Sequence, residues 1–313
     1  MAYASRRKVA YRKKASRSTR RYSSRFAPRR SSAKKRTYRK KTSMSKRRIL
    51  NTTSTKKRNG MLSWSNTTGS GAVQTTGLGS LNAIGGTGNN IGAITMFCPT
   101  AMDLNAAGSH TTTLESRRTA TTCYMRGFSE HIRVQTSSGL PWFWRRICFT
   151  LKEDFQAALN SDTPTNTYRP YVETSNGLER LWLNQTINAM PNTIADQQNV
   201  IFKGVAGVDW NDLIVAPVDT RRVTLKSDVT RTIRSGNAAG TVREFKLWHP
   251  MNKNLVYDDD ENGVSENSLY FSVASKAGMG DYFIYDIFLP GLGSTTTDII
   301  NVTANSTLYW HEK

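Results

Sequence analysis

Positive charge is confined to one end of this chain. Residues 1–58 hold 24 of the 44 Lys and Arg side chains of the 313-residue sequence, and the first carboxylate is Asp103. Residues 59–313 hold the other 20 basic groups and all 23 acidic ones, so a segment of charge +24 precedes a body of charge −3. A chain with this asymmetry is suited to bind a polyanion with one segment and to fold with the other.

The basic segment, residues 1–58, is called the arm here. Its apolar side chains occur singly and follow neither a helix nor a strand period. Burial of so little apolar area does not offset about 1–2 kcal/mol of backbone entropy per residue, and like charges repel, so we expect the arm to be disordered.

The composition of the arm predicts nucleic-acid binding. Arg can donate two hydrogen bonds to one phosphate, and Lys adds a point charge. The candidate phosphate-binding residues are Arg6, Arg7, Lys8, Arg12, Lys13, Lys14, Arg17, Arg20, Arg21, Arg25, Arg29, Arg30, Lys34, Lys35, Arg36, Arg39, Lys40, Lys41, Lys46, Arg47, Arg48, Lys56, Lys57 and Arg58. Aromatic rings interleaved with these cations offer unpaired bases a stacking surface, and the candidates are Tyr11, Tyr22, Phe26 and Tyr38.

Other roles of the arm remain open. The clusters Lys34–Arg36 and Lys46–Arg48 have the composition of nuclear import signals, which is compatible with nucleic-acid binding. A solvated tail attracted to an anionic membrane surface is the alternative. The sequence shows no signal-peptide hydrophobic stretch and no apolar run of about 18 residues, so we expect neither secretion nor a membrane span.

The body has the pattern of an all-β domain. Val223–Ile233 alternates apolar and polar residues, whereas Tyr282–Leu289 is apolar on both faces except at Asp286, which is typical of a strand covered on both sides. Further strands are expected at Ile94–Cys98, Thr122–Gln135, Trp142–Lys152, Arg180–Thr186, Val200–Lys203, Val242–His249, Leu269–Val273 and Ile299–Tyr309. A short helix is expected at Asp154–Leu159. So many strands with few helices indicate a sandwich or barrel.

Composition also suggests domain boundaries. Residues 59–92 end in a stretch rich in Gly, Ser, Thr and Asn, which predicts a linker between the arm and a β-domain at residues 93–313. The three cysteines, Cys98, Cys123 and Cys148, form no C-x-x-C motif. We expect them to be buried and reduced; a zinc site assembled from distant strands is the weaker alternative.

No catalytic motif is found in the sequence, and no catalytic residue, resident metal or cofactor is predicted. One run of four acidic residues requires an explanation, because adjacent carboxylates repel each other unless a cation or a basic surface neutralises them. Three roles stay open for it: a solvated turn, a patch that pairs with a basic surface of another subunit, and an ion site, which would be required by a nuclease. The residues are Asp258, Asp259, Asp260 and Glu261.

Eight longer motifs carry a resemblance to a known family. They are KRRILN from Lys46, KKRNGMLSWSNTT from Lys56, TCYMRGFSE from Thr122, GLPWFWRRICF from Gly139, APVDTRRV from Ala216, KLWHPMNKNLVYDDDENG from Lys246, GMGDYFIYDIFLPG from Gly278 and TANSTLYWHEK from Thr303. In these motifs and in the character of its arm, the chain resembles the capsid proteins of genomoviruses, the gemycircularvirus-like group of small circular single-stranded DNA viruses.

The resemblance implies an eight-stranded jelly roll related to geminivirus coat proteins. It further implies a homo-oligomeric icosahedral shell of sixty subunits with T=1 symmetry, a single-stranded DNA genome as cargo, host nuclear import receptors as partners, and residence in the virion and the host nucleus. Sixty arms of 24 charges would neutralise about 1440 phosphates, or roughly 1.4 kilobases of single strand. The alternative is a non-capsid nuclear nucleic-acid-binding or shuttle protein whose β-sandwich recognises something else.

Overall fold

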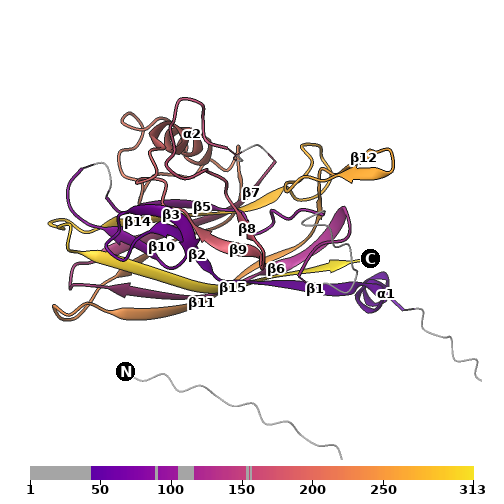
Figure 1. Ribbon diagram of the computed structural model, residues 1–313, viewed down its shortest axis with the longest axis horizontal. Helices are drawn as coiled ribbons and strands as arrows, with labels where there is room; N and C mark the ends of the chain where they lie inside the picture. The colour runs from indigo at the N-terminus through magenta and orange to yellow at the C-terminus, as the bar shows by residue number, and fades with distance from the viewer. Residues whose placement is uncertain (1–43, 89–90, 105–115, 153–154, 156) are drawn as a thin grey trace, which may run out of the picture. The chain divides into compact units, whose positions relative to one another are not determined.

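The computed structural model in Figure 1 describes residues 44–88, 91–104, 116–152, 155 and 157–313. The chain divides into two compact units, residues 1–45 and residues 46–313, and the second unit is described below. The expected disorder of residues 1–43 lies outside the described residues.

The described residues form an all-β unit with two helices. The helices are α1 (Lys46–Thr53) and α2 (Pro191–Ile201). The strands are β1 (Thr55–Met61), β2 (Ser63–Thr67), β3 (Val73–Leu78), β4 (Leu81–Ile84), β5 (Ala93–Phe97), β6 (Thr122–Thr136), β7 (Trp142–Leu151), β8 (Val172–Thr174), β9 (Gly177–Trp182), β10 (Thr224–Ile233), β11 (Val242–Val256), β12 (Asp260–Asn262), β13 (Ser265–Asn267), β14 (Asp281–Pro290) and β15 (Ile299–Glu312).

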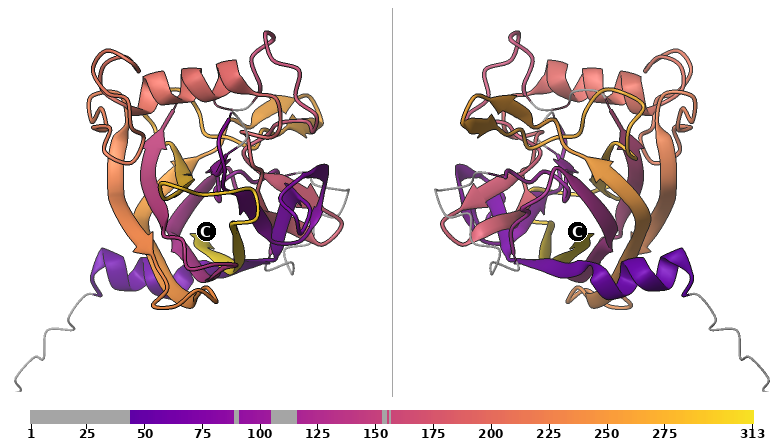
Figure 2. Two further views of the ribbon diagram at one scale, coloured as in Figure 1. Left: turned by 90° about the vertical axis from the view of Figure 1, so that its left-hand side faces the viewer. Right: turned by 90° about the vertical axis from the view of Figure 1, so that its right-hand side faces the viewer.

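Two antiparallel sheets face each other and enclose the core (Figure 2). The first sheet has the order β1-β15-β6-β11, with β4 also paired to β15, and the second has the order β10-β7-β14-β5. The edge strand of the first sheet is interrupted: β1 pairs with residues 306–312 of β15 and β4 pairs with residues 299–302. Between them Ser63 Oγ donates to the carbonyl of Ala304 at 2.8 Å, so β1 and β4 act as one composite strand.

The pairing of these strands is nested. With β1 and β4 counted as one, eight strands make up the two facing sheets. The first pairs with the last (β15), the second (β5) with the seventh (β14), the third (β6) with the sixth (β11), and the fourth (β7) with the fifth (β10). This is the pairing of one long hairpin that has been rolled into two layers.

A third sheet, β3-β2-β9-β8, closes the side of the sandwich between β1 and β5, the edge strands of the two facing sheets. Covering edges in this way protects their unpaired backbone groups from another chain. β2 runs parallel to β9, and Arg180 of β9 reaches between the two facing sheets.

The two facing sheets differ in how they are covered. The outer face of the second sheet packs against α2 and the adjoining loops, where Ile201 and Phe202 join a cluster with Phe149 and Phe283. Every residue of β14 from Asp281 to Phe288 is therefore buried, and the prediction of a strand covered on both sides is confirmed. In Figures 1 and 2, α2 lies on the far side of the second sheet from β15 and β11.

The strands predicted from apolar patterns are mostly confirmed. β5, β6, β7, β10, β11, β14 and β15 lie where they were expected, although β11 extends seven residues beyond His249. The strand expected at Arg180–Thr186 is shifted toward the N-terminus, because β9 overlaps it only at residues 180–182. All three cysteines are free and buried, as predicted. Burial, reinforced by the nearby Asp281 and Glu312 carboxylates respectively, raises the pKa of the Cys98 and Cys123 thiols, which keeps them protonated and unreactive.

Three local predictions are wrong. Val200 and Ile201 end α2 instead of starting a strand, because the buried face of this helix carries Thr193 and Gln197, which give no apolar signal. Leu269–Val273 forms only an isolated bridge, since the Ser272 amide donates to the Asp281 carboxylate at 3.0 Å instead of to a strand. The described part of the expected helix Asp154–Leu159 is not helical.

The boundaries of the arm and linker also need correction. Residues 46–58 of the expected disordered arm are part of the fold, because they contain α1 and the start of β1. Residues 59–92 are not a linker, because they contribute β2, β3 and β4, with Leu81 and Ala83 in the core. Their polar side chains are hydrogen-bonded when buried: Asn66 exchanges two bonds with Asn184, at 2.8 and 3.1 Å.

A cluster of charged side chains, called the buried charge cluster here, lies at the centre of the sandwich. Arg146 of β7 donates to both oxygens of Asp286 on β14 at 2.7 and 2.8 Å and also pairs with Glu130 of β6. Arg180 donates to Glu130 at 2.9 Å and to Asp286 at 3.1 Å. His249 of β11 completes the cluster, with Nε2 3.0 Å from Glu130.

The two arginines balance the two carboxylates of this cluster, and the surrounding charges fix the protonation of Glu130 and His249. Burial alone would raise the pKa of Glu130, but Arg146 and Arg180 hold it far below its usual value. Burial alone would lower the pKa of His249, because it also disfavours the charged form of a base. Hydrogen bonds to Cys148 and Glu130 nevertheless raise this pKa from 6.5 to about 9. The imidazole is therefore protonated at neutral pH and donates to Glu130.

This protonation predicts a pH-dependent stability. Because the folded-state pKa of His249 lies above its unfolded value, the contribution is complete below pH 6.5 and is lost as pH rises through 9. Relative to His249→Gln, the free energy of unfolding of the wild type should fall by about 3 kcal/mol between pH 6 and pH 10. Urea denaturation followed by circular dichroism measures the difference. His131→Gln, at an exposed position, serves as control, and a wild-type-minus-variant difference that is constant with pH would contradict the assignment.

Candidate nucleic-acid interface

Most of the predicted phosphate-binding residues precede the described part of the chain. The 18 basic residues from Arg6 to Lys41 lie outside the described residues, as do the four stacking candidates Tyr11, Tyr22, Phe26 and Tyr38. The six that the structure places are Lys46, Arg47 and Arg48 in α1 and Lys56, Lys57 and Arg58 in β1. The end of the predicted binding segment is thus built into the fold.

Helix α1 begins with basic residues. Lys46 and Arg48 are exposed in its first turn, which holds no acidic residue. Cations there add to the positive end of the helix dipole, so a nearby anion would stabilise this turn.

Strand β1 divides its three basic residues between its two faces. Lys56 and Arg58 are exposed, whereas Lys57 points inward and is 4% exposed. Lys57 Nζ lies 3.0 Å from the Glu312 carboxylate and donates to the Arg117 carbonyl and Thr119 Oγ1, both at 2.9 Å. With its three donors used inside the protein, Lys57 does not bind phosphate, and its predicted role is corrected to a structural one.

The outward face of the first sheet carries further cations. Its four long strands β1, β6, β11 and β15 hold three carboxylates, of which Glu130 and Glu312 point into the core and only Glu244 is exposed. The exposed basic residues on this outward face are Lys56, Arg58, Arg126, Arg133 and Lys246. We call this surface the basic face. It was missed in the sequence because its cations come from three separated strands, β1, β6 and β11, and are brought to one face only by the strand register.

The acidic run separates into one buried and three exposed carboxylates. Asp259 is paired with Arg118 by two hydrogen bonds of 2.6 Å, and both side chains are almost completely buried. Burial alone would raise the pKa of Asp259, but the hydrogen bonds from Arg118 lower it, so the carboxylate stays ionised. Arg118 also lies 3.8 Å from the ring centre of Tyr257.

The other three carboxylates are exposed on the hairpin of β12 and β13. Asp258, Asp260 and Glu261 precede a tight turn in which Gly263 has a φ of 64°. Among the described residues, no group of three or more His, Cys, Asp or Glu side chains is arranged to hold a metal ion. The structure therefore brings Asp259 to an ion pair within the chain and leaves the rest on a projecting hairpin (Figure 1).

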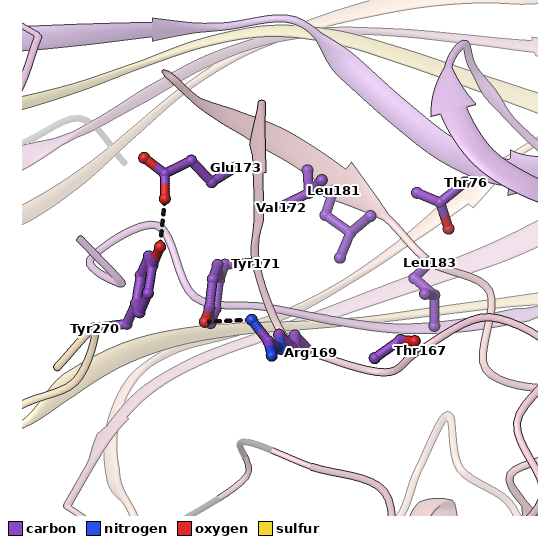
Figure 3. Close-up of a pocket in the computed structure, with 9 residues that line it drawn as sticks. All are labelled: Thr76, Thr167, Arg169, Tyr171, Val172, Glu173, Leu181, Leu183 and Tyr270. Carbon is purple, nitrogen blue, oxygen red and sulfur yellow. Dashed lines mark hydrogen bonds between the residues drawn. The ribbon is translucent and has the colours of Figure 1, made fainter. Parts of the chain in front are cut away.

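A pocket of about 400 Å³ opens beside β8 and β9 (Figure 3). Tyr171 and Tyr270 stack in its wall with ring centres 4.4 Å apart. Arg169 donates to the Tyr171 hydroxyl at 3.4 Å, and the Tyr270 hydroxyl donates to Glu173. Four polar side chains of the pocket wall thus bind one another in two pairs.

The comparisons with known proteins add no assignment. No protein-family model matches the chain, and a search of curated proteins gives no match. Among the described residues, no helix has the length and apolar character needed to cross a membrane.

The two faces of β1 generate the second prediction. Lys57→Met leaves Glu312 buried without its cation and should lower the free energy of unfolding by about 3–5 kcal/mol. The matched control is Lys56→Met, one position away on the exposed face, where a change below about 0.5 kcal/mol is expected. Thermal and urea unfolding of the two variants checks this, and equal destabilisation would show that Lys57 is not the structural member of the pair.

Proposed function

We propose that this chain is the structural subunit of a small icosahedral viral shell, and that its arm packages single-stranded DNA. The arm and its 18 basic residues before Lys46 would condense the DNA, and the β-sandwich would form the shell. This function is non-enzymatic and needs no cofactor.

The nested strand pairing carries the proposal. A double-sheet jelly roll has eight strands and two Greek keys. Its strands pair as in a rolled hairpin: first with last, second with seventh, third with sixth and fourth with fifth. The two facing sheets here follow that order. Jelly rolls are common in viral capsids, although the fold alone does not determine function.

The join between arm and sandwich supports a packaging role. The basic segment enters the fold through α1 and β1, and β1 is hydrogen-bonded to β15 along seven residues. Beside this entry lies the basic face, whose exposed cations continue the charge of the arm. A polyanion held by the arm would therefore meet a second positive surface instead of a repelling one.

Exposed apolar side chains on loops support subunit contacts. Val208, Val215, Val264 and Leu292 are each more than 70% exposed, and all lie in connections between strands or helices. Single exposed apolar residues are ordinary, and these four lie on three separate loops; a shell of identical subunits would bury them if the loops formed the subunit contacts. The exposed carboxylates Asp258, Asp260 and Glu261 sit beside Val264 on one such loop and fit the salt-bridging alternative better than the ion-site alternative.

The remaining expectations follow from this function. A shell protein that packages DNA in the nucleus needs host import receptors, and the clusters at Lys34–Arg36 and Lys46–Arg48 would be their ligands. Removal of Lys57 from the phosphate-binding set leaves 23 cations per arm, so sixty copies would still neutralise roughly 1.4 kilobases of single strand.

Electron microscopy tests the proposal directly. The purified protein should form uniform closed particles when single-stranded DNA is added at low salt, roughly 20 nm across if sixty domains of this size tile the shell. DNA-bound monomers or irregular aggregates, without closed particles under any salt condition, would instead favour the nuclear binding or shuttle protein.

Two truncations test how the arm and the fold divide. Deletion of residues 1–45 removes 18 cations but no described strand, so the protein should stay folded and lose about a hundredfold in affinity for single-stranded DNA at low salt, with a flatter salt dependence. Deletion of residues 1–58 also removes the start of β1 and Lys57, and should reduce stability as well. Filter binding and circular dichroism separate the two effects; unchanged DNA affinity after the shorter deletion would refute the arm's role.

A further inference from the structure

We propose that the basic face is itself a nucleic-acid site, on which unpaired bases stack between aromatic rings while cations hold the backbone. This inference rests on the proposed function, since the single-stranded DNA that the site would bind is the DNA that the arm collects. It extends that function by placing a base-contacting site on the folded sheet, separate from the arm.

Two aromatic pairs lie on this face. Trp248 of β11 and Tyr309 of β15 have ring centres 5.9 Å apart, and Tyr124 of β6 and His311 of β15 are also 5.9 Å apart. Trp248 is 46% exposed and Tyr124 is 38% exposed, so each shows a large part of its ring to solvent. Most of the other tryptophans of the body are in the core, which makes the position of Trp248 unusual in this chain.

The backbone is shaped to hold Trp248 in place. Gly127 of β6 pairs with Tyr309 of β15 and has a φ of 155°, next to irregularities in the register of β6 with both β11 and β15. A Cβ atom at residue 127 would lie 2.5 Å from Cζ2 of Trp248 and 2.7 Å from the His249 carbonyl oxygen. Because Gly127 has no side chain, the Trp248 indole can pack directly against the backbone of β6, toward Tyr309.

Cations surround both aromatic pairs. Lys56 is the register partner of His311, and Arg58 is the register partner of Tyr309. Partial burial, together with the charges of Lys56 and Arg126, lowers the pKa of His311, which shows that positive charge converges there. On the other side of the first pair, Lys246 is exposed two residues before Trp248 on the same strand. Rings flanked by cations match the alternation of base and phosphate along a nucleic-acid strand.

The face is open in the part of the chain that the structure describes. The second sheet uses α2 and its loops to cover its outer face. In the first sheet, residues of β6 alternate between exposed and buried, and the outward positions of β11 from Val242 to Pro250 are exposed. The one exposed carboxylate, Glu244, lies 3.1 Å from His131 and pairs in register with Arg133, toward the end of β6 away from Tyr124. The region around both aromatic pairs therefore has no exposed negative charge in these four strands.

The chemistry favours an unpaired strand over other polyanions. A duplex or an anionic membrane would be attracted by the cations alone, and neither presents free base faces to the rings. Aromatic rings exposed on a four-stranded sheet can stack two or three unpaired bases, and each stack is worth about 1–3 kcal/mol in general, that is, about 5- to 150-fold in affinity.

The test compares two probes on the unmodified full chain. An oligo(dT) strand and an abasic strand of equal length carry the same phosphates, but only the first can stack. Fluorescence anisotropy at high salt, where the arm's electrostatic binding is weakened, should show oligo(dT) bound at least about tenfold more tightly than the abasic strand. Tryptophan fluorescence should be quenched by oligo(dT) and not by the abasic strand. Equal affinity for both strands at every salt concentration would overturn the inference.

Variants locate the effect. Trp248→Leu with Tyr309→Leu should abolish the preference for oligo(dT), and Tyr124→Leu alone should reduce it by a few fold. The matched control is Tyr171→Leu with Tyr270→Leu, which removes a stacked aromatic pair from the pocket wall and should leave the preference unchanged. Circular dichroism confirms that each variant is folded. A preference retained in the Trp248 and Tyr309 variant, or lost in the control, would place the stacking elsewhere and overturn the assignment.

The inference and the proposed function can fail separately. Closed, DNA-containing particles formed equally well by the wild type and by the Trp248 and Tyr309 variant, with no preference for oligo(dT), would uphold the shell and reject the stacking site. A preference for oligo(dT) that depends on Trp248 and Tyr309, in a protein that forms no closed particle, would uphold the stacking site and reject the shell.

Discussion

The arrangement of the sandwich depends on the buried charge cluster. Arg146 and Arg180 share Glu130 and Asp286 between them, and these four side chains come from one strand of the first sheet, two strands of the second and one of the third. A buried charge without its partner costs several kcal/mol, so the cluster tolerates only the register in which all four meet. Apolar packing alone would permit strands to slide, whereas this network fixes the three sheets relative to one another.

The fixed core has a consequence for the surface. Because the second sheet is covered on both faces at β14, every residue of this strand from Asp281 to Phe288 is buried and contributes nothing to the surface. The first sheet is covered on one face, so every second residue of β1, β6 and β15 is released from packing. Those released positions hold most of the cations of the basic face and three of its four rings, and the fourth ring, Trp248, lies on the same face in β11. The proposed binding surface therefore lies on the side of the sandwich that does not pack against the rest of the fold.

Sequence patterns predicted the strands whose burial follows from apolar residues, such as β6, β7 and β14. They failed where polar groups are buried in pairs: Asn66 with Asn184 in the supposed linker, and Thr193 and Gln197 on the inner face of α2. Asp286 was recognised as an exception in an apolar strand, but its partners were not. Pairing between residues more than 100 positions apart depends on strand register, which composition and periodicity do not contain.

The same reasoning explains why the charge of the arm cannot be assigned by counting. Lys56, Lys57 and Arg58 are equivalent in composition, yet the two-residue period of β1 sends the middle one into an ion pair with Glu312 and its neighbours to the surface. This pair anchors β1 to the last strand at the point where the basic segment meets the fold. Tension applied to the arm by bound DNA would therefore be carried by the pairing of β1 with β15 and by one buried salt bridge, and would not reach the core unless that pair broke first.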